Sequence, residues 1–170
     1  HRRPPECRRR RRYRVRARAS GIDGAFSRAV KYLLDTNVVS ELMRPAPDLA
    51  VLAWVDAHMT QDLWLCSVVA AELAYGVGRM PTGRRKRQLA DALAITLEED
   101  FAGRVLAFDL ASALDCASLL AVREQAGRSV AWADAQIAAT CLAHGASLAT
   151  RNTQHFEGLG VPLLNPWTSG

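Results

Sequence analysis

The chain has 170 residues and is 49% hydrophobic, which is typical of one globular domain with a substantial core. No apolar run approaches the roughly eighteen residues of a membrane span, so we expect no membrane association. The four cysteines are widely spaced, with no CxxC pair and no histidine at zinc spacing. This pattern favours a cytoplasmic protein without disulfides or structural zinc.

The formal net charge of +5 is divided unevenly along the chain. Residues 1–30 hold eleven arginines against Glu6 and Asp23, whereas residues 31–170 are mildly acidic. The arginine-rich leader is predicted to be disordered. It is either an RNA-binding arm or, as we favour, non-native upstream sequence, because a valine codon such as that of Val30 can start a bacterial chain. Residues 31–170 would then form the one folded domain.

Short apolar strands alternate with longer helical patterns from residue 31 onwards. In the first half, a strand is predicted at Lys31–Leu34, helices at Val38–Met43 and Asp48–His58, a strand at Leu63–Cys66 and a helix at Val68–Gly78. In the second half, we predict a basic surface turn at 81–88 that leads into a helix to about Glu99, followed by a strand at Val105–Phe108. Helices are then predicted at Ala111–Ala126 and Trp132–His144, and strands at Ser147–Ala149 and Val161–Leu164. This alternation indicates an α/β fold, with a parallel sheet of about five strands flanked by helices on both faces.

Three carboxylates and one amide stand near the ends of these strands. Asp35 directly follows the first strand, and Glu72 lies in the first turns of the helix after the second. Asp134 opens the helix that begins at residue 132, and Asn152 follows the fourth strand. Because ligands of open parallel sheets bind off the carboxyl ends of the strands, we expect these four side chains to meet at one edge.

The surroundings of Glu72 and Asp134 favour a bound cation. Both lie among Ala, Val and Leu residues, with no basic partner at helical spacing. Converging carboxylates raise one another's pKa unless a cation is present, and Mg²⁺ or Mn²⁺ is typically held by a few carboxylates. Such a site hydrolyses phosphodiesters through a metal-activated water.

Each of these residues also has an ordinary structural interpretation. Asp134 could be only a helix N-cap, and Asp35 only a turn residue at a strand end. Glu72 could face solvent, and Asn152 could be a left-handed turn residue. The residues alone therefore indicate an α/β domain with an acidic edge.

Four motifs occur in a distinctive order and spacing, namely "YLLDTNVVSEL" (32–42), "SVVAAELAYGV" (67–77), "ADAQIAAT" (133–140) and "LATRNTQHF" (148–156). Together they resemble the PIN-domain toxin ribonucleases of the VapC type, over essentially all of residues 31–167. The resemblance implies a PIN fold and a metal-dependent endoribonuclease that is the toxin of a bacterial toxin–antitoxin pair.

By motif position, Asp35, Glu72 and Asp134 match the family's three acidic metal ligands. Asn152 falls where some members have a fourth Asp, so a second metal ion would be held weakly or only with RNA bound. The resemblance further implies RNA as substrate, a small antitoxin encoded upstream and a homodimer, with no organic cofactor.

Thr36 and Asn37 complete the DTN motif, and we expect them to orient Asp35. For Glu41 and Asp109, helix capping or buried hydrogen bonding is expected rather than metal ligation. The interpretation for Trp132 is core packing rather than base stacking. The basic residues 84–87 are expected to form a solvated face, and His144 and His155 are not needed as bases.

Two alternatives to the ribonuclease hypothesis differ from it in chemistry. One is a catalytically inactive PIN-like module that binds RNA or protein, and the intact acidic trio argues against it. The other is an Asp-based phosphotransferase or phosphatase. The DxDxT pattern of one such class is broken here, because Asn37 stands where its second Asp belongs.

Overall fold

The computed structural model describes residues 30–168, so residues 1–29 of the leader lie outside the described part of the chain. Five parallel strands form a sheet in the order β3-β2-β1-β4-β5, which confirms the predicted fold class. The strands are β1 (Tyr32–Leu34), β2 (Leu63–Cys66), β3 (Val105–Leu106), β4 (Ser147–Ala149) and β5 (Leu163–Leu164).

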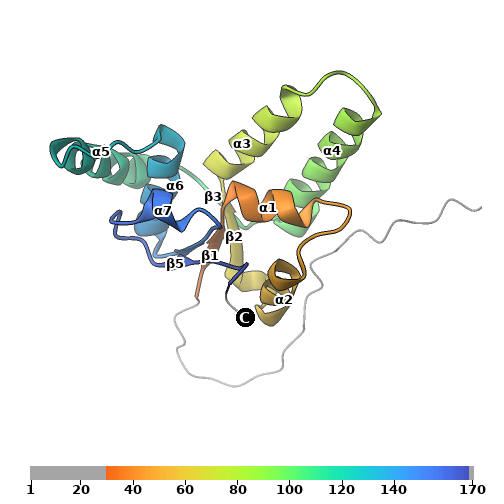
Figure 1. Cartoon of the computed structure of the whole chain (residues 1–170), viewed down its shortest axis with the longest axis horizontal. Helices are drawn as coiled ribbons and strands as arrows, with labels where there is room; N and C mark the ends of the chain where they lie inside the picture. The colour runs from red at the N-terminus through yellow and green to blue at the C-terminus, as the bar shows by residue number, and fades with distance from the viewer. Residues whose placement is uncertain (1–29, 169–170) are drawn as a thin grey trace, which may run out of the picture.

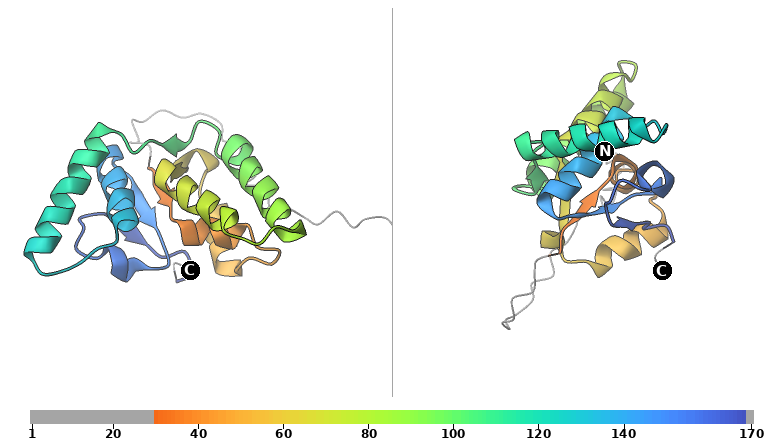
Figure 2. Two further views of the ribbon diagram at one scale, coloured as in Figure 1. Left: turned by 90° about the horizontal axis from the view of Figure 1, so that it is seen from above. Right: turned by 90° about the vertical axis from the view of Figure 1, so that its left-hand side faces the viewer.

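Helices stand on two sides of these strands (Figure 1). They are α1 (Thr36–Leu42), α2 (Leu49–Ala57), α3 (Ser67–Gly78), α4 (Arg84–Ile95), α5 (Leu110–Gln125), α6 (Trp132–His144) and α7 (Thr153–Phe156). Figure 1 shows α5, α6 and α7 to the left of the strands and α1 to α4 to the right. Figure 2 shows the α3–α4 pair and α5 at opposite ends of the molecule.

The core is built from the apolar runs of the central strands. Leu33, Leu34, Leu63, Leu65 and Leu148 are fully buried. Strands covered on both faces have continuous apolar sequences, which is why the sequence predicts these strands well. Full burial of each such side chain contributes about 1.5–3 kcal/mol. In the described part of the chain, no helix combines the length and apolar character needed to cross a membrane.

The prediction of a basic surface turn at 81–88 is wrong in part. Helix α4 already begins at Arg84, because Arg and Lys are good helix formers, and the turn is limited to the residues just before it. The Lys86 Nζ group donates hydrogen bonds to the carbonyls of Gly78 at 2.6 Å and Met80 at 3.2 Å, which ties α4 to α3. The helix ends at Ile95 rather than at about Glu99, and Thr96–Asp100 continue as a π-helical turn.

Short elements are the other difference from the predicted pattern. A 3₁₀ turn at Thr60–Asp62 and helix α7 are absent from the prediction, because segments of three or four residues show no periodicity. The third and fifth strands are shorter than predicted, at two residues each. None of these differences moves the carboxyl ends of β1 and β4, where the candidate site lies.

The strand order places a crevice beside β1. From β1 the chain proceeds to β2 and β3 on one side, and then returns to β4 and β5 on the other. Such a reversal of direction marks the usual ligand site of an open α/β sheet. Leu34 pairs with Ala149, and the Asp35 N–H donates to the Ala149 carbonyl at 3.0 Å. The residues that follow β1 and β4 therefore meet.

Candidate active site

Asp35 is the buried centre of this crevice. It follows β1, is 6% exposed and caps the N-terminus of α1. Its Oδ1 accepts a hydrogen bond from the Thr36 N–H at 2.8 Å, and its Oδ2 accepts from Asn37 Nδ2 at 2.6 Å and from the Thr150 hydroxyl at 2.7 Å. Asp35 is thus both a capping residue and a carboxylate held in one orientation by three donors.

Thr150 is a site residue that the sequence-based reasoning missed. It is fully buried at the end of β4 and links the two strand ends. Besides donating to Asp35, its hydroxyl accepts from Asn37 Nδ2 at 3.2 Å and from the Asn152 N–H at 3.0 Å. Asn37 Oδ1 in turn accepts from the Arg151 N–H at 3.1 Å. The available signal was positional, because Thr150 follows β4 just as Asp35 follows β1.

Glu72 reaches the same crevice from α3. Its Oε2 accepts a hydrogen bond of 2.5 Å from the Thr36 hydroxyl, and its side chain is half-buried. The interpretation that Glu72 faces solvent is therefore wrong. The expectation that Thr36 and Asn37 orient Asp35 is supported by these contacts, with the addition that Thr36 uses its backbone for Asp35 and its hydroxyl for Glu72.

Asp134 comes from the first turn of α6. The N-cap residue of this helix is Ala131, and Asp134 is the third helical residue, so its interpretation as an N-cap is wrong. Its Oδ2 lies 3.3 Å from Nδ1 of His155 in α7. His155 thus contacts a candidate ligand.

A single cleft of about 510 Å³ joins these residues. It is lined by Asp35, Thr36, Asn37, Glu72, Tyr75, Asp134, Asn152 and His155, which include all six predicted site residues. Asn152 is exposed at the cleft, with φ −94° and ψ 54°, so its interpretation as a left-handed turn residue is wrong. Tyr75 and His155 are the lining residues that sequence reasoning did not assign to the site.

The surroundings of Asp35 and Asp134 disfavour the ionised form of their carboxyl groups. Burial raises the pKa of the Asp35 carboxyl, and the nearby Asp134 raises it further, while hydrogen bonds from Thr150, Thr36 and Asn37 lower it. Burial also raises the pKa of Asp134; His155 opposes this rise and Glu72 adds to it. Carboxylates in this environment gain from a nearby cation.

The donors of the cleft are chemically suited to a hard divalent cation. The available donors are the oxygen atoms of three carboxylates and of the Asn152 side-chain amide. Mg²⁺ and Mn²⁺ prefer oxygen ligands of this kind. Within residues 30–168, no three acidic, histidine or cysteine side chains already stand close enough to hold a metal ion between them. Glu72, for example, is engaged by the Thr36 hydroxyl. Coordination by all three acids would therefore require their side chains to draw together.

Comparison with known proteins identifies the fold family. The family model of the PIN domain matches residues 32–160, which is most of the chain. The chain belongs to the PIN-domain family.

Individual relatives confirm the resemblance to PIN-domain toxins of the VapC type. The chain is 44% identical to the VapC ribonuclease Y4jK of Sinorhizobium fredii over 135 residues, which cover 79% of this chain and 96% of that protein. It is 39% identical to the toxin FitB of Neisseria gonorrhoeae, over 79% of this chain and 97% of that protein. A solved structure of FitAB bound to an IR36 DNA fragment contains a chain that is 38% identical, with a TM-score of 0.73; the match covers 80% of this chain and 95% of that one.

Two further acids, Glu41 and Asp109, lie outside the PIN-domain cleft. They have the roles in hydrogen bonding and helix capping that the sequence predicts. Glu41 is buried and accepts from the Asp48 N–H at 2.9 Å, while its other oxygen contacts Arg44 at 3.0 Å. Asp109 caps α5 by accepting from the Ser112 N–H at 2.9 Å. Both residues stabilise loops and helix ends.

The described cysteines are structural. Cys66, Cys116 and Cys141 are free and buried. Burial raises the pKa of the Cys66 thiol to about 11 and also raises the pKa of Cys141. Neutral, buried thiols are poor nucleophiles, so these three described cysteines are not suited to a nucleophilic role in the PIN-domain site.

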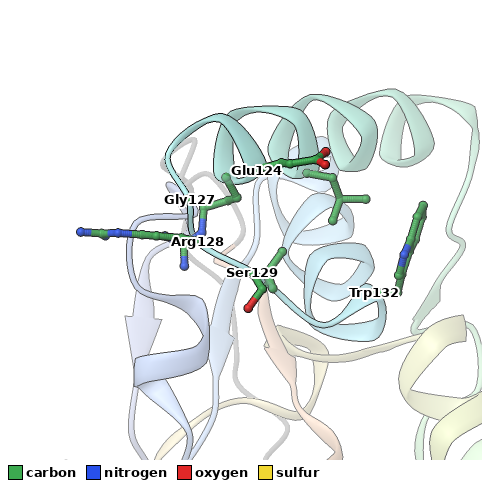
Figure 3. Close-up of a pocket in the computed structure, with 8 residues that line it drawn as sticks. Glu124, Gly127, Arg128, Ser129 and Trp132 are labelled. Carbon is green, nitrogen blue, oxygen red and sulfur yellow. The ribbon is translucent and has the colours of Figure 1, made fainter.

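Trp132 is not where the sequence predicts it. It is 67% exposed rather than packed in the core, and it does not line the acidic cleft. It borders a second cavity of about 460 Å³ between α5 and α6, which we call the α5–α6 cavity (Figure 3). The residues lining this cavity are Leu120, Arg123, Glu124, Gly127, Arg128, Ser129, Val130 and Trp132. In Figure 3, the Arg128 side chain points away from Trp132.

Proposed function

We propose that this chain is the toxin of a bacterial type II toxin–antitoxin system and an endoribonuclease that hydrolyses RNA with Mg²⁺ or Mn²⁺. The observation that carries the proposal is the convergence of Asp35, Glu72 and Asp134 on one cleft, in a PIN-domain chain that is 44% identical to a VapC ribonuclease. The residues that line the cleft include no lysine or arginine that would neutralise these acids.

The side chains of the cleft would have different roles in the reaction. When bound, the divalent cation supplies an activated water and stabilises charge on the phosphate. Asp35, Glu72 and Asp134 would hold this cation. Thr36 fixes Glu72 and, with its backbone N–H, Asp35. Asn152 stands exposed at the cleft, where its amide would position the attacking water or the phosphate.

The buried hydrogen bonds on Asp35 favour catalysis over an inactive binding module. Burying a carboxylate is costly, even when it is hydrogen-bonded, unless its charge is compensated. An inactive module would gain only the N-cap of α1 from this arrangement, whereas a cation-binding nuclease also gains a metal ligand. The raised pKa of Asp35 is therefore more consistent with an active site.

Cleavage assays with the purified full-length chain test the proposal. RNA should be cut in Mg²⁺ or Mn²⁺ and left intact in EDTA, and Asp134→Asn should lower the rate by about 10³-fold. Asp109→Asn is the matched control, because it keeps a good N-cap at an acid outside the cleft. If the unmodified chain leaves structured and single-stranded RNAs intact in both metals, the nuclease proposal is wrong.

For partners, we propose a small cognate antitoxin encoded next to this chain, and a second copy of the chain. The support is that similar chains are the toxin FitB and a component of a FitAB complex. We also propose a cytoplasmic location, which the free thiols of Cys66, Cys116 and Cys141 support. Co-expression with the adjacent open reading frame and size-exclusion chromatography should yield a stoichiometric complex that no longer cleaves RNA. Elution of the chain alone would contradict the antitoxin proposal.

A further inference from the structure

His155 lies in the acidic cleft and contacts one of its carboxylates. It belongs to α7, which the buried Phe156 anchors to the core. Its Nδ1 lies 3.3 Å from Oδ2 of Asp134, and its side chain is 59% exposed. Among the described residues that line the cleft, it is the side chain that brings a basic nitrogen; the others bring carboxylate, amide and hydroxyl groups.

We propose that His155 is a nitrogen ligand of the cleft cation and makes this site prefer a first-row transition-metal ion, such as Mn²⁺, over Mg²⁺. The inference rests on the proposed metal-dependent function. Mg²⁺ is bound through oxygen ligands and retained water, whereas imidazole is a favourable ligand for transition metals. Replacing one oxygen donor by an imidazole therefore lowers the affinity for Mg²⁺ relative to Mn²⁺.

The spacing of the two side chains fits shared coordination. Two ligands at about 2.1 Å from one octahedral ion, placed at right angles, are about 3 Å apart. The 3.3 Å between His155 Nδ1 and Asp134 Oδ2 is close to this separation. The separation of these two atoms is therefore compatible with coordination of one ion.

A competing interpretation is that His155 is only a counter-charge for Asp134. The two interpretations predict opposite effects. A counter-charge competes with a metal ion, so its removal strengthens metal binding, whereas removal of a ligand weakens it.

Measurements of metal binding to the purified full-length chain distinguish the ligand interpretation of His155 from the counter-charge interpretation. Isothermal titration with Mn²⁺ and with Mg²⁺ gives the two affinities, and pulsed electron paramagnetic resonance of bound Mn²⁺ detects coupling to the imidazole nitrogen. We compare the unmodified chain with His155→Ala, His155→Asp and the control His144→Ala. His144 lies at the end of α6, 3.8 Å from Asp109 and outside the cleft. Since His155 is largely exposed, its substitutions should not impair folding.

The expected result is that His155→Ala weakens Mn²⁺ binding about tenfold, changes Mg²⁺ binding less than about twofold, and abolishes the nitrogen coupling. His155→Asp should also abolish the coupling but shift the preference towards Mg²⁺, and His144→Ala should match the unmodified chain. Unchanged or tighter Mn²⁺ binding in His155→Ala, or persistent nitrogen coupling, overturns the role of His155 and leaves the proposed function intact. If the unmodified chain binds neither metal, the metal-dependent function itself fails, and this inference fails with it.

Discussion

The acidic cleft and the α5–α6 cavity are similar in size but differ in construction. Their volumes are about 510 and 460 Å³. The cleft is lined by residues that are far apart in sequence, such as Asp35 and His155, and the buried Thr150 beneath it donates to Asp35 across 115 positions. The α5–α6 cavity is lined by the single stretch 120–132. Convergence of distant segments, held by buried hydrogen bonds, therefore distinguishes the candidate active site from the α5–α6 cavity, whereas volume does not.

The acidic cleft and the α5–α6 cavity also differ in how firmly the orientation of their side chains is fixed. Asp35 is buried and accepts three hydrogen bonds, so its orientation is fixed before any ligand arrives. Trp132 is 67% exposed at the rim of its cavity. Substitutions in the cleft should accordingly change activity strongly, and substitutions around the α5–α6 cavity should change it little.

The largest effect is expected for Asp35→Asn. It removes the central carboxylate but keeps its shape and its capping ability, so RNA cleavage should fall by about 10³-fold while the chain stays folded. Without metal, the thermal midpoint should be slightly lower than that of the unmodified chain, because the new NH2 group faces the Asn37 Nδ2 donor in place of an accepting oxygen. Cleavage rates with saturating Mn²⁺ and thermal melts in EDTA measure both. Activity within tenfold of the unmodified chain would show that the cleft is not the active site.

A smaller loss is expected for Thr150→Val, which replaces only a hydroxyl by a methyl group. Asp35 loses one donor, and the Asn152 N–H loses its acceptor, so cleavage should fall by about 10–100-fold. Stability should fall by about 1–3 kcal/mol, because buried polar groups lose their partners.

Thr140→Val is the matched control for Thr150→Val. Thr140 is equally buried, but its hydroxyl donates to the Gln136 carbonyl within α6, at 2.8 Å. Its substitution should leave cleavage nearly unchanged. Equal activity losses in both variants would mean that Thr150 acts only through general stability. Denaturant unfolding of both variants supplies the stability comparison.

The substitution Asp109→Ala should destabilise helix α5, which forms one wall of the α5–α6 cavity. It should leave the acidic cleft unchanged. Hydrogen bonds from the Ser112 backbone and hydroxyl lower the pKa of Asp109, so the ionised form stabilises the folded chain. This contribution is present above the unfolded pKa and is lost as pH falls through the folded pKa. The thermal midpoint of the variant should be about 2–4 °C lower at neutral pH, and the gap should narrow in acid. Asp115→Ala, on the same helix beyond its first turn, removes no N-cap and is the matched control for the loss of the Asp109 cap.

The sequence predicts the cleft because its acids interrupt apolar patterns. A carboxylate such as Asp35 at the end of a buried strand is conspicuous, and the motifs around Glu72 and Asp134 can be compared with a known family. The positional signal of Thr150 is weaker, because a threonine after a strand is common and its role depends on β1 and β4 being neighbours. Strand order is a tertiary property, and local patterns do not encode it.

The position of Trp132 shows the same limit for helix faces. An aromatic residue at the start of a helix is usually expected in the core, but its direction depends on how α5 and α6 pack together. That packing leaves Trp132 outside. His155 likewise reaches Asp134 because α7 packs against α6, and α7 is too short to show a periodicity of its own.

The smallest effect is expected for Trp132→Ala. The ring is mostly exposed, so its removal should change the free energy of unfolding by less than about 0.5 kcal/mol. Because Trp132 lies outside the acidic cleft, kcat/KM for RNA should change by less than about threefold, and Trp132→Phe should match the unmodified chain. Steady-state cleavage of one labelled RNA by both variants tests this. A rise in KM of tenfold or more in Trp132→Ala, with kcat unchanged and recovery in Trp132→Phe, would show that substrate extends from the cleft over the N-terminus of α6. The two cavities would then be parts of one RNA-binding surface, and the distinction between them would fail.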